Sequence, residues 1–260
     1  MNNQLPSGSQ ASRLRLDAVA RHYLSAVAQN DKNLSPQQAQ QTLFELRVRQ
    51  IELEMEQQEL RAASAQLRMN EQIIRTLAYN DALTGLANRL LLRVRLTQAM
   101  LAGSRSGCHG ALLFLDMDHF KAVNDQYGHG AGDQLLIEVA ARLSRCVGAS
   151  DTVARLGGDE FVVLLDELAP DMAQAGEHAA VLAEAIRTAL AQPYSLRTAT
   201  DGPTVRVQHA CSVSIGVVLF LGQARSEERL LSQADAVMYQ AKAAGRNQVR
   251  FHASARGLPA

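Results

Sequence analysis

The chain has 260 residues, 47% of them hydrophobic, and its 26 basic residues balance 26 acidic ones. This length suits one catalytic domain with a smaller module, and the apolar content is sufficient for a substantial core. A net charge of zero gives no global attraction for nucleic acid or for an anionic membrane, so any phosphate ligand must be held by local groups.

The cysteines and the N-terminus favour a reducing compartment. Cys108, Cys146 and Cys211 are widely spaced and odd in number, which indicates neither a disulfide framework nor a zinc site. The first residues lack the basic start and apolar run of a signal peptide, and no stretch reaches the roughly 20 apolar residues that span a bilayer. We therefore expect a soluble cytoplasmic protein, with no membrane insertion and no nucleic-acid partner.

The N-terminal part of the chain is predicted to be helical. Residues 1–11 are polar and contain Pro and Gly, which predicts a disordered tail, and residues 12–29 place apolar side chains near helical spacing. Ser35, Pro36 and Gln38 then form a helix start, since Ser35 can cap the first turn and Gln38 can complete a capping box. The helix that follows can continue without Gly or Pro until Asp81.

Apolar residues recur every seventh position along this helix. The series is Leu46, Leu53, Leu60, Leu67 and Ile74, and it favours a coiled coil. The complementary seam positions are Gln50, Gln57, Ser64 and Glu71. These polar residues weaken a two-stranded seam, so a helical hairpin with residues 12–29 stays open. In either form, residues 12–79 are predicted to be a dimerisation or signalling region, and no motif in them identifies an upstream regulator.

From residue 80 the pattern changes to alternating helices and strands. We predict helices at 90–100, 132–147, 172–191 and 226–244, strands at 111–115, 152–156 and 161–165, and one or two strands within 205–219. The strands at 152–156 and 161–165 are joined by a short glycine-containing turn, which is typical of a hairpin. A hairpin within a mixture of strands and helices predicts an α/β (α+β) domain with a mixed sheet over residues 80–255, preceded by an all-α segment.

Asp116 is the first candidate for catalytic chemistry. It ends the apolar strand 111–115, where a buried strand meets solvent, and Met117, Phe120 and Lys121 follow in a predicted loop. A carboxylate at a strand end, followed by free backbone amides and a lysine, suits a metal-bound phosphate. Magnesium favours such hard oxygen ligands and commonly uses one or two carboxylates together with substrate phosphates.

The turn between the paired strands carries a second group of candidates. Gly157 and Gly158 allow a ligand to approach the backbone closely, and Asp159 and Glu160 follow at once. If this hairpin packs against strand 111–115, it brings Asp159 or Glu160 near Asp116. Two such carboxylates can share one or two metal ions, which would clamp a triphosphate and activate a hydroxyl.

Five separated motifs resemble the GGDEF family of diguanylate cyclases. They are DALTGLANR at 81–89, LDMDHFKAVNDQYGHGAGDQLL at 115–136, RLGGDEF at 155–161, SIGV at 214–217 and ADAVMYQAKAAGRNQV at 234–249. The resemblance covers about residues 79–252, with Ala87 where the family usually has Pro. It implies a mainly antiparallel sheet with flanking helices, similar to nucleotide cyclase and polymerase palm domains.

The resemblance also implies roles for the candidate residues. Asp116, Asp159 and the Met117 carbonyl would bind magnesium or manganese, and Glu160 would assist at the metal or near the attacking hydroxyl. Asp159 would help to deprotonate that hydroxyl. The amides of residues 117–120 would cradle the phosphates, and Lys121 would stabilise charge in the transition state.

The remaining matches concern the nucleotide and the assembly. Asn124 and Asp133 would read the guanine edge, and His129 would lie beside the base or ribose. Lys242 and Arg246, one helical turn apart, would face the β- and γ-phosphates. Two GTP molecules, one on each subunit of a homodimer, would be joined into cyclic di-GMP. Asp81 and Arg89 are interpreted as structural, as a helix cap and part of a surface pair.

One departure from the family pattern concerns product inhibition. The family often carries an inhibitory product site, Arg-x-x-Asp, five residues before the glycine pair. Asp151 matches its aspartate, but Gly148 stands at the arginine position and Arg145 lies about one helical turn away. The resemblance therefore implies weak or absent inhibition through this site. Asp133 favours cyclic di-GMP, because a subgroup that makes the mixed dinucleotide lacks this residue.

Two other functions stay open at this point. The first is a non-catalytic module that binds GTP or cyclic di-GMP as a receptor, against which Asp116, Lys121, Asp159 and Glu160 argue. The second is an interaction protein that works through its helical region.

Overall fold

The computed structural model describes residues 35–198, 205–222 and 226–253. The predicted tail at 1–11 and helix at 12–29 lie outside these residues. The chain divides into two compact units, Met1–Asn70 and Glu71–Ala260. Within the described ranges, no helix is both long and apolar enough to cross a membrane.

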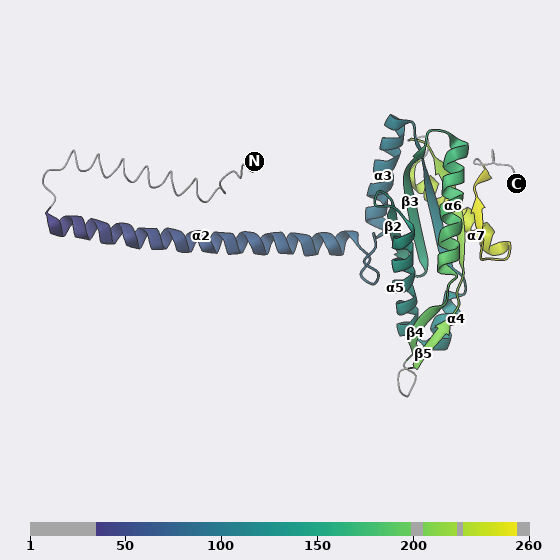
Figure 1. The fold of residues 1–260 in the computed structure, drawn as a ribbon, viewed down its shortest axis with the longest axis horizontal. Helices are drawn as coiled ribbons and strands as arrows, with labels where there is room; N and C mark the ends of the chain where they lie inside the picture. Colours follow the sequence, from purple (N-terminus) through teal and green to yellow (C-terminus); the bar gives the residue numbers. More distant parts are fainter. Residues whose placement is uncertain (1–34, 199–204, 223–225, 254–260) are drawn as a thin grey trace, which may run out of the picture. The chain divides into compact units, whose positions relative to one another are not determined.

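Helices and strands alternate after one long N-terminal helix (Figure 1). In chain order they are α2 (Pro36–Tyr79), α3 (Arg89–Ser106), β1 (His109–Met117), α4 (Phe120–Tyr127), α5 (His129–Cys146), β2 (Thr152–Gly157), β3 (Glu160–Ala169), α6 (Met172–Leu190), β4 (Tyr194–Thr198), β5 (Val205–His209), β6 (Val213–Phe220), α7 (Glu227–Ala243) and β7 (Val249–Phe251).

The predicted capping box begins α2. The Ser35 amide donates to Gln38 Oε1 at 3.0 Å, and the Gln38 amide donates to Ser35 Oγ at 3.3 Å. This reciprocal pair satisfies two of the amides that a helix start leaves without partners. The side chains of the seven-residue series are exposed in the single chain, with Leu60 at 73%. The coiled coil and the hairpin both stay predictions.

A five-stranded sheet forms the centre of the second unit, in the order β2-β3-β1-β6-β7. All neighbouring strands are antiparallel except β6 and β7, which are parallel. β4 and β5 form a separate antiparallel pair. The predicted mixed, mainly antiparallel sheet is confirmed, as is the β2–β3 hairpin and its packing beside β1.

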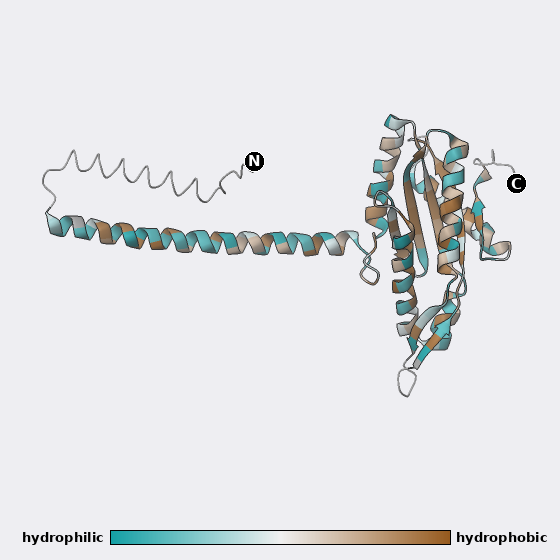
Figure 2. Ribbon diagram, viewed as in Figure 1, coloured by the Kyte–Doolittle hydropathy of each residue, from teal (hydrophilic) through white to brown (hydrophobic). Residues whose placement is uncertain are grey.

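Hydrophobic cores fill both faces of this sheet, because β1, β3 and β6 are almost continuously apolar (Figure 2). Side chains alternate between the faces of a strand. Leu113 and Leu115 therefore pack with α5 and α6, whereas Leu112 and Phe114 pack with α3 and α7. By the same alternation Asp116 lies on the α7 face.

α7 lies unusually close to the sheet at Gly216 in β6. A Cβ atom at this position would come within 2.3 Å of backbone atoms of Ala234 and Met238. Only glycine permits this approach, which sets the height of α7 above the sheet and hence the position of Lys242 near its C-terminus.

Three elements were not predicted. Phe120 and Lys121 were predicted to lie in a loop but begin α4, and β4 and β7 have no counterpart among the predicted elements. Region 205–219 contains two strands. β7 has three residues and pairs in parallel with β6, so it depends on a tertiary contact rather than on a local pattern. β4 carries Tyr194, which is fully buried and anchors a hairpin outside the main sheet.

Candidate active site

Asp116 lies near the end of the central strand, between two neighbouring strands. It pairs across the sheet with Glu160 of β3 on one side and with Ser214 of β6 on the other. Directly opposed residues point to the same face, with Cβ atoms about 4.5–5.5 Å apart. The predicted approach of the glycine-turn carboxylates to Asp116 is therefore confirmed. The Asp116 residue itself is only 7% exposed.

Lys242 of α7 is the cation that faces this carboxylate. Its Nζ lies 2.6 Å from Asp116 Oδ1, so the two side chains form an ion pair. Burial raises the pKa of Asp116 to about 6; Lys242 offsets part of the rise, and the negative charges of Asp159 and Glu160 add to it. Lys242 thus contacts a predicted metal ligand, whereas the resemblance implied contact with phosphates.

Arg155 holds the glycine turn between β2 and β3. Its Nε and Nη2 donate to the Gly158 carbonyl at 3.0 and 2.8 Å, and its Nη1 donates to Asp81 at 2.9 Å. Gly158 has φ 52°, in the left-handed region that glycine adopts readily. Asp159 follows in the turn, and its carbonyl accepts from the Met117 amide at 3.3 Å, which ties the turn to the end of β1.

The interpretation of Asp81 as a helix cap is wrong. Asn88 caps α3 by accepting from the amides of Leu90 and Leu91, whereas Asp81 accepts from Thr84 and Arg155. Burial alone would raise the pKa of Asp81, but these hydrogen bonds outweigh it and lower the pKa below its usual value. The DALTGLANR motif therefore supports the glycine turn through Arg155.

The phosphate cradle is smaller than the sequence predicted. The Met117 amide is engaged by Asp159, and the Asp118 amide donates to the Ser212 carbonyl at 2.8 Å, because both residues continue the sheet ladder. The chain then turns at His119, with φ 61°, and enters α4. The amides at the start of α4, at Phe120 and Lys121, are the groups that suit an anion, and the Lys121 side chain is exposed beside them.

The proposed guanine-reading residues gather where α4 meets α5. Asn124 packs so closely on α5 that a Cβ atom at Gly132 would come within 1.9 Å of its Oδ1. His129 and Asp133, both exposed, belong to the first turns of α5. No hydrogen bond or ion pair among the described residues joins these side chains to the Asp116 corner, so their joint action on one nucleotide stays a prediction.

Arg246 does not continue the helical register of Lys242. α7 ends at Ala243, and Gly245, Arg246 and Asn247 all have positive φ, at 113°, 60° and 43°. The expectation that Lys242 and Arg246 lie one helical turn apart is therefore wrong, because the chain reverses between them. Arg246 is exposed in this turn.

Asp118 is a site residue that the sequence reasoning missed. It is a carboxylate with 2% exposure that accepts from Ser212 Oγ, Ser214 Oγ and the Asn247 amide. The available signal was the Asp-x-Asp spacing at a strand end together with Ser-x-Ser in the predicted strand of 205–219.

The residues at this corner fit a divalent cation. The described part of the chain holds no group of three or more His, Cys, Asp or Glu side chains arranged to bind a metal ion by themselves. Magnesium, however, commonly takes one or two carboxylates and completes its shell with water and substrate phosphates. Asp116 is a buried carboxylate that faces Glu160, lies near Asp159 and has one lysine as its close partner, so this corner meets that requirement.

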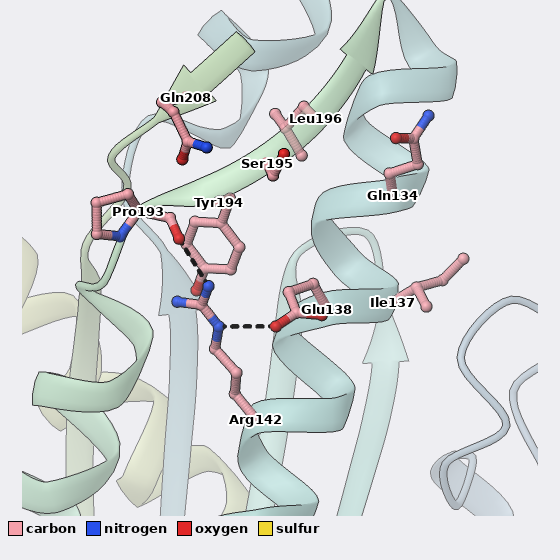
Figure 3. A pocket seen from close by; sticks show the side chains of 9 residues that line it. All are labelled: Gln134, Ile137, Glu138, Arg142, Pro193, Tyr194, Ser195, Leu196 and Gln208. Atoms are coloured by element: carbon pink, nitrogen blue, oxygen red, sulfur yellow. Dashed lines mark hydrogen bonds and ion pairs between the residues drawn. The ribbon is translucent and has the colours of Figure 1, made fainter. Parts of the chain in front are cut away.

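A pocket of about 440 Å³ lies elsewhere, between α5 and the β4–β5 pair (Figure 3). Its charged centre is Arg142, which stacks 3.9 Å from the centroid of the Tyr194 ring and bonds Glu138. Arg142 also donates to the carbonyl oxygens of Ala189, Gln192 and Pro193. None of the predicted site residues lines this pocket, and its arginine already has its partners.

Comparison with known proteins identifies the family. The model of the diguanylate cyclase GGDEF domain matches residues 78–248. The bifunctional diguanylate cyclase/cyclic di-GMP phosphodiesterase MucR of Pseudomonas aeruginosa is 44% identical over 192 residues, which cover 74% of this chain and 26% of MucR. Diguanylate cyclase TpbB of the same species is 38% identical over 74% of this chain and 42% of its own length. The chain thus spans less than half of these relatives.

A solved structure extends the similarity into α2. The coiled coil and GGDEF domain of DgcB from Caulobacter crescentus, in complex with c-di-GMP, aligns with a TM-score of 0.66 and 30% identity. The alignment covers 77% of this chain and 99% of the DgcB chain. With the family model matching well over half of its residues, the chain belongs to the GGDEF-domain family of diguanylate cyclases.

Proposed function

We propose that this protein is a diguanylate cyclase that condenses two GTP molecules into cyclic di-GMP and pyrophosphate. Residues 80–255 form its catalytic domain, and residues 12–79 bring two subunits together. The main support is the corner at which Asp116, Asp159 and Glu160 converge beside Lys242. One lysine does not balance three carboxylates at the end of a buried sheet, and the remaining negative charge is costly there. This favours a magnesium or manganese site with Asp116, Asp159, Glu160 and the Met117 carbonyl as its ligands.

Each half of the reaction is a displacement at phosphorus. The 3′-oxygen of one GTP forms a bond to the α-phosphorus of the other GTP, and the bond from that phosphorus to the β-phosphate oxygen breaks. Pyrophosphate leaves, and the hydroxyl proton passes to Asp159. Repeating the step in the opposite direction closes the ring, which explains why two subunits, each with one GTP, must face each other.

The residues of the site divide this work. A bound divalent cation would supply the positive charge that neutralises the phosphate oxygens. The start of α4 and Lys121 would hold phosphate oxygens by amide and ammonium donors. Asn124 and Asp133 would donate to and accept from the guanine edge, with His129 nearby. Gly157 and Gly158, which have no side chains, would let the nucleotide approach the turn.

Two substitutions test this function. We expect Asp116→Ala and Asp159→Ala each to lower the rate of cyclic di-GMP formation roughly a thousandfold or more, because each removes a carboxylate from the cation site. Product is measured by chromatography, and folding by circular dichroism. Glu177→Ala removes an exposed carboxylate of α6 and serves as the matched control. If either site variant keeps wild-type turnover, the assignment is wrong; if the wild-type protein binds GTP without turnover, the receptor function replaces the enzyme.

A further inference from the structure

We propose that Asp118 is a positioning residue that fixes the turn at residues 245–247 and thereby sets Arg246 for binding the terminal phosphates of GTP. The role of Arg246 rests on the proposed function, whereas the contact between Asp118 and the turn is a feature of the fold.

Both carboxylate oxygens of Asp118 accept hydrogen bonds from within the protein. Oδ1 accepts from Ser214 Oγ at 2.7 Å, and Oδ2 accepts from Ser212 Oγ at 2.6 Å and from the Asn247 amide at 3.0 Å. The residue is 2% exposed. These three donors and the burial of the residue keep both oxygens turned toward the protein interior. Asp118 therefore differs from Asp116, whose close partner is the Lys242 ammonium.

The turn at residues 245–247 needs an external restraint. Arg246 and Asn247 both adopt the left-handed region, with φ of 60° and 43°, which costs a residue with a side chain roughly 1 kcal/mol or more. Inside the turn, the Arg246 amide donates to the Ala241 carbonyl at 3.1 Å. The next amide, that of Asn247, donates to Asp118, which lies outside the turn. This bond restrains the peptide that links Arg246 to Asn247.

This restraint couples Arg246 to the catalytic corner. Asp118 lies two residues after Asp116, and its own amide donates to the carbonyl of Ser212, the residue before β6. A second contact, from Arg187 Nη1 to Asn247 Oδ1 at 2.7 Å, holds the other side of Asn247. The backbone of Arg246 is thus tied to the strand end that carries the predicted metal ligand. Without the Asp118 contact, the arginine would sample more positions, and part of its phosphate affinity would be lost as conformational entropy.

A double-mutant cycle tests the proposal. We measure the affinity of the full chain for a GTP analogue with a non-cleavable α–β linkage, and for GMP, in Asp118→Ala, Arg246→Ala and the double variant. We expect each single variant to bind the analogue roughly tenfold more weakly than wild type. Its affinity for GMP should stay within about twofold of wild type, because GMP lacks the terminal phosphates. The double variant should bind the analogue no more weakly than Arg246→Ala alone. Additive losses, or equal losses for GMP, would overturn the proposal.

Asp118→Asn separates the hydrogen bonds from the charge. Its carbonyl oxygen can still accept from Asn247 and Ser212, and its amide can donate to Ser214, whose hydroxyl can rotate. We expect its affinity to stay within about threefold of wild type. A loss as large as that of Asp118→Ala would show that the charge, and not the position of the turn, matters. Ser214→Ala is the control that removes one donor to Asp118 but leaves the turn, and it should lower the melting temperature while keeping the affinity.

If Asp118→Ala does not fold, Asp118→Ser tests the same bond, since it removes the carboxylate oxygen that accepts from the Asn247 amide and keeps a polar group for Ser212 and Ser214. This variant should lower the affinity for the analogue in the same way, and it should cause no further loss of affinity in the Arg246→Ala background. An unchanged affinity would overturn the proposal. All of these measurements are of binding, so they stay decisive if the wild-type protein proves to make no cyclic di-GMP, an outcome that would contradict only the proposed catalytic function.

Discussion

Two aspartates separated by one residue show how the surroundings divide their roles. Asp116 and Asp118 are both buried, but Asp118 accepts three hydrogen bonds, whereas Asp116 has a lysine as its close partner and two further carboxylates nearby. Burial and the two neighbouring carboxylates raise the pKa of Asp116, whereas the three donors of Asp118 hold its side chain in place. The first is suited to receive a cation, and the second to hold the backbone.

The raised pKa of Asp116 predicts how stability depends on pH when divalent metal is removed. The pKa is raised from 3.8 to about 6, so between these values the folded protein keeps a proton that the unfolded chain has released. The free energy of unfolding should therefore fall as the pH rises from about 4 to about 6, by roughly 2–3 kcal/mol, and stay lower above that range.

Urea unfolding with a chelator between pH 4 and 7 measures this effect. The difference between wild type and Asp116→Asn isolates the group, and the variant should be the more stable protein at pH 7. Adding magnesium at pH 7 should stabilise the wild type more than the variant. A variant that is less stable than wild type at pH 7 would mean that the Lys242 ion pair outweighs the burial of Asp116.

Product inhibition is predicted to be weak through the site upstream of the glycine turn. The Gly148 amide donates to Asp151 Oδ2 at 2.9 Å, so Asp151 caps its own turn, and Arg145 bonds Glu138 instead. Within the described part of the chain, no arginine forms an ion pair with Asp151 that could help to hold guanine and phosphate in a bidentate manner. Titration of cyclic di-GMP into the turnover assay measures the effect. Potent inhibition that disappears in Asp151→Ala would show that another cation completes the site.

Among the helices and strands, those with strong local sequence patterns were predicted correctly. The apolar strands β1 and β3 and the turn between β2 and β3 were predicted, and their pairing brings Glu160 opposite Asp116 as expected. α4 was not predicted, although Phe120, Val123 and Tyr127 are spaced for one helix face, because its 8 residues are too few for a clear periodic pattern. β7, the reversal after α7 and the inward orientation of Asp118 depend on contacts distant in sequence.

The segment between α2 and α3 is predicted to stabilise the glycine turn. Asp81→Asn should weaken the contact with Arg155, whose side chain is 11% exposed, and lower stability at pH 7 by roughly 1–3 kcal/mol. The lowered pKa of Asp81 means that its contribution is present above the ordinary value of 3.8 and is lost as the pH falls through the lower value of the folded protein.

Chemical unfolding of this variant at pH 7 and at pH 3 checks the prediction, and the difference from wild type should be smaller at pH 3. Turnover should fall several-fold, because Arg155 also holds the Gly158 carbonyl. Asp125→Asn changes an exposed carboxylate of α4 and is the control for stability. Equal destabilisation at both pH values would mean that the hydrogen bond to Thr84, and not the charge, is what matters.

For the whole molecule, the apolar series of α2 predicts how assembly controls the rate. Leu46, Leu53, Leu60, Leu67 and Ile74 are 58–73% exposed in the single chain, an arrangement that is favourable only when a partner covers it. The proposed reaction needs two subunits, so the helix that pairs them should set the rate. The polar seam at Gln50 and Gln57 predicts an association of modest strength.

Changing Leu53 and Leu60 together to Asp would place charges in any such seam, which is costly without partners. Activity per subunit should collapse at low protein concentration and recover in part at high concentration, and light scattering should report a shift from dimer to monomer in parallel. Gln58→Asp with Gln66→Asp adds the same two charges at exposed positions off the series, and this control should stay dimeric and active. If the leucine variant also stays dimeric and fully active, the helices pack within one subunit, and the catalytic domains must pair through their own surfaces.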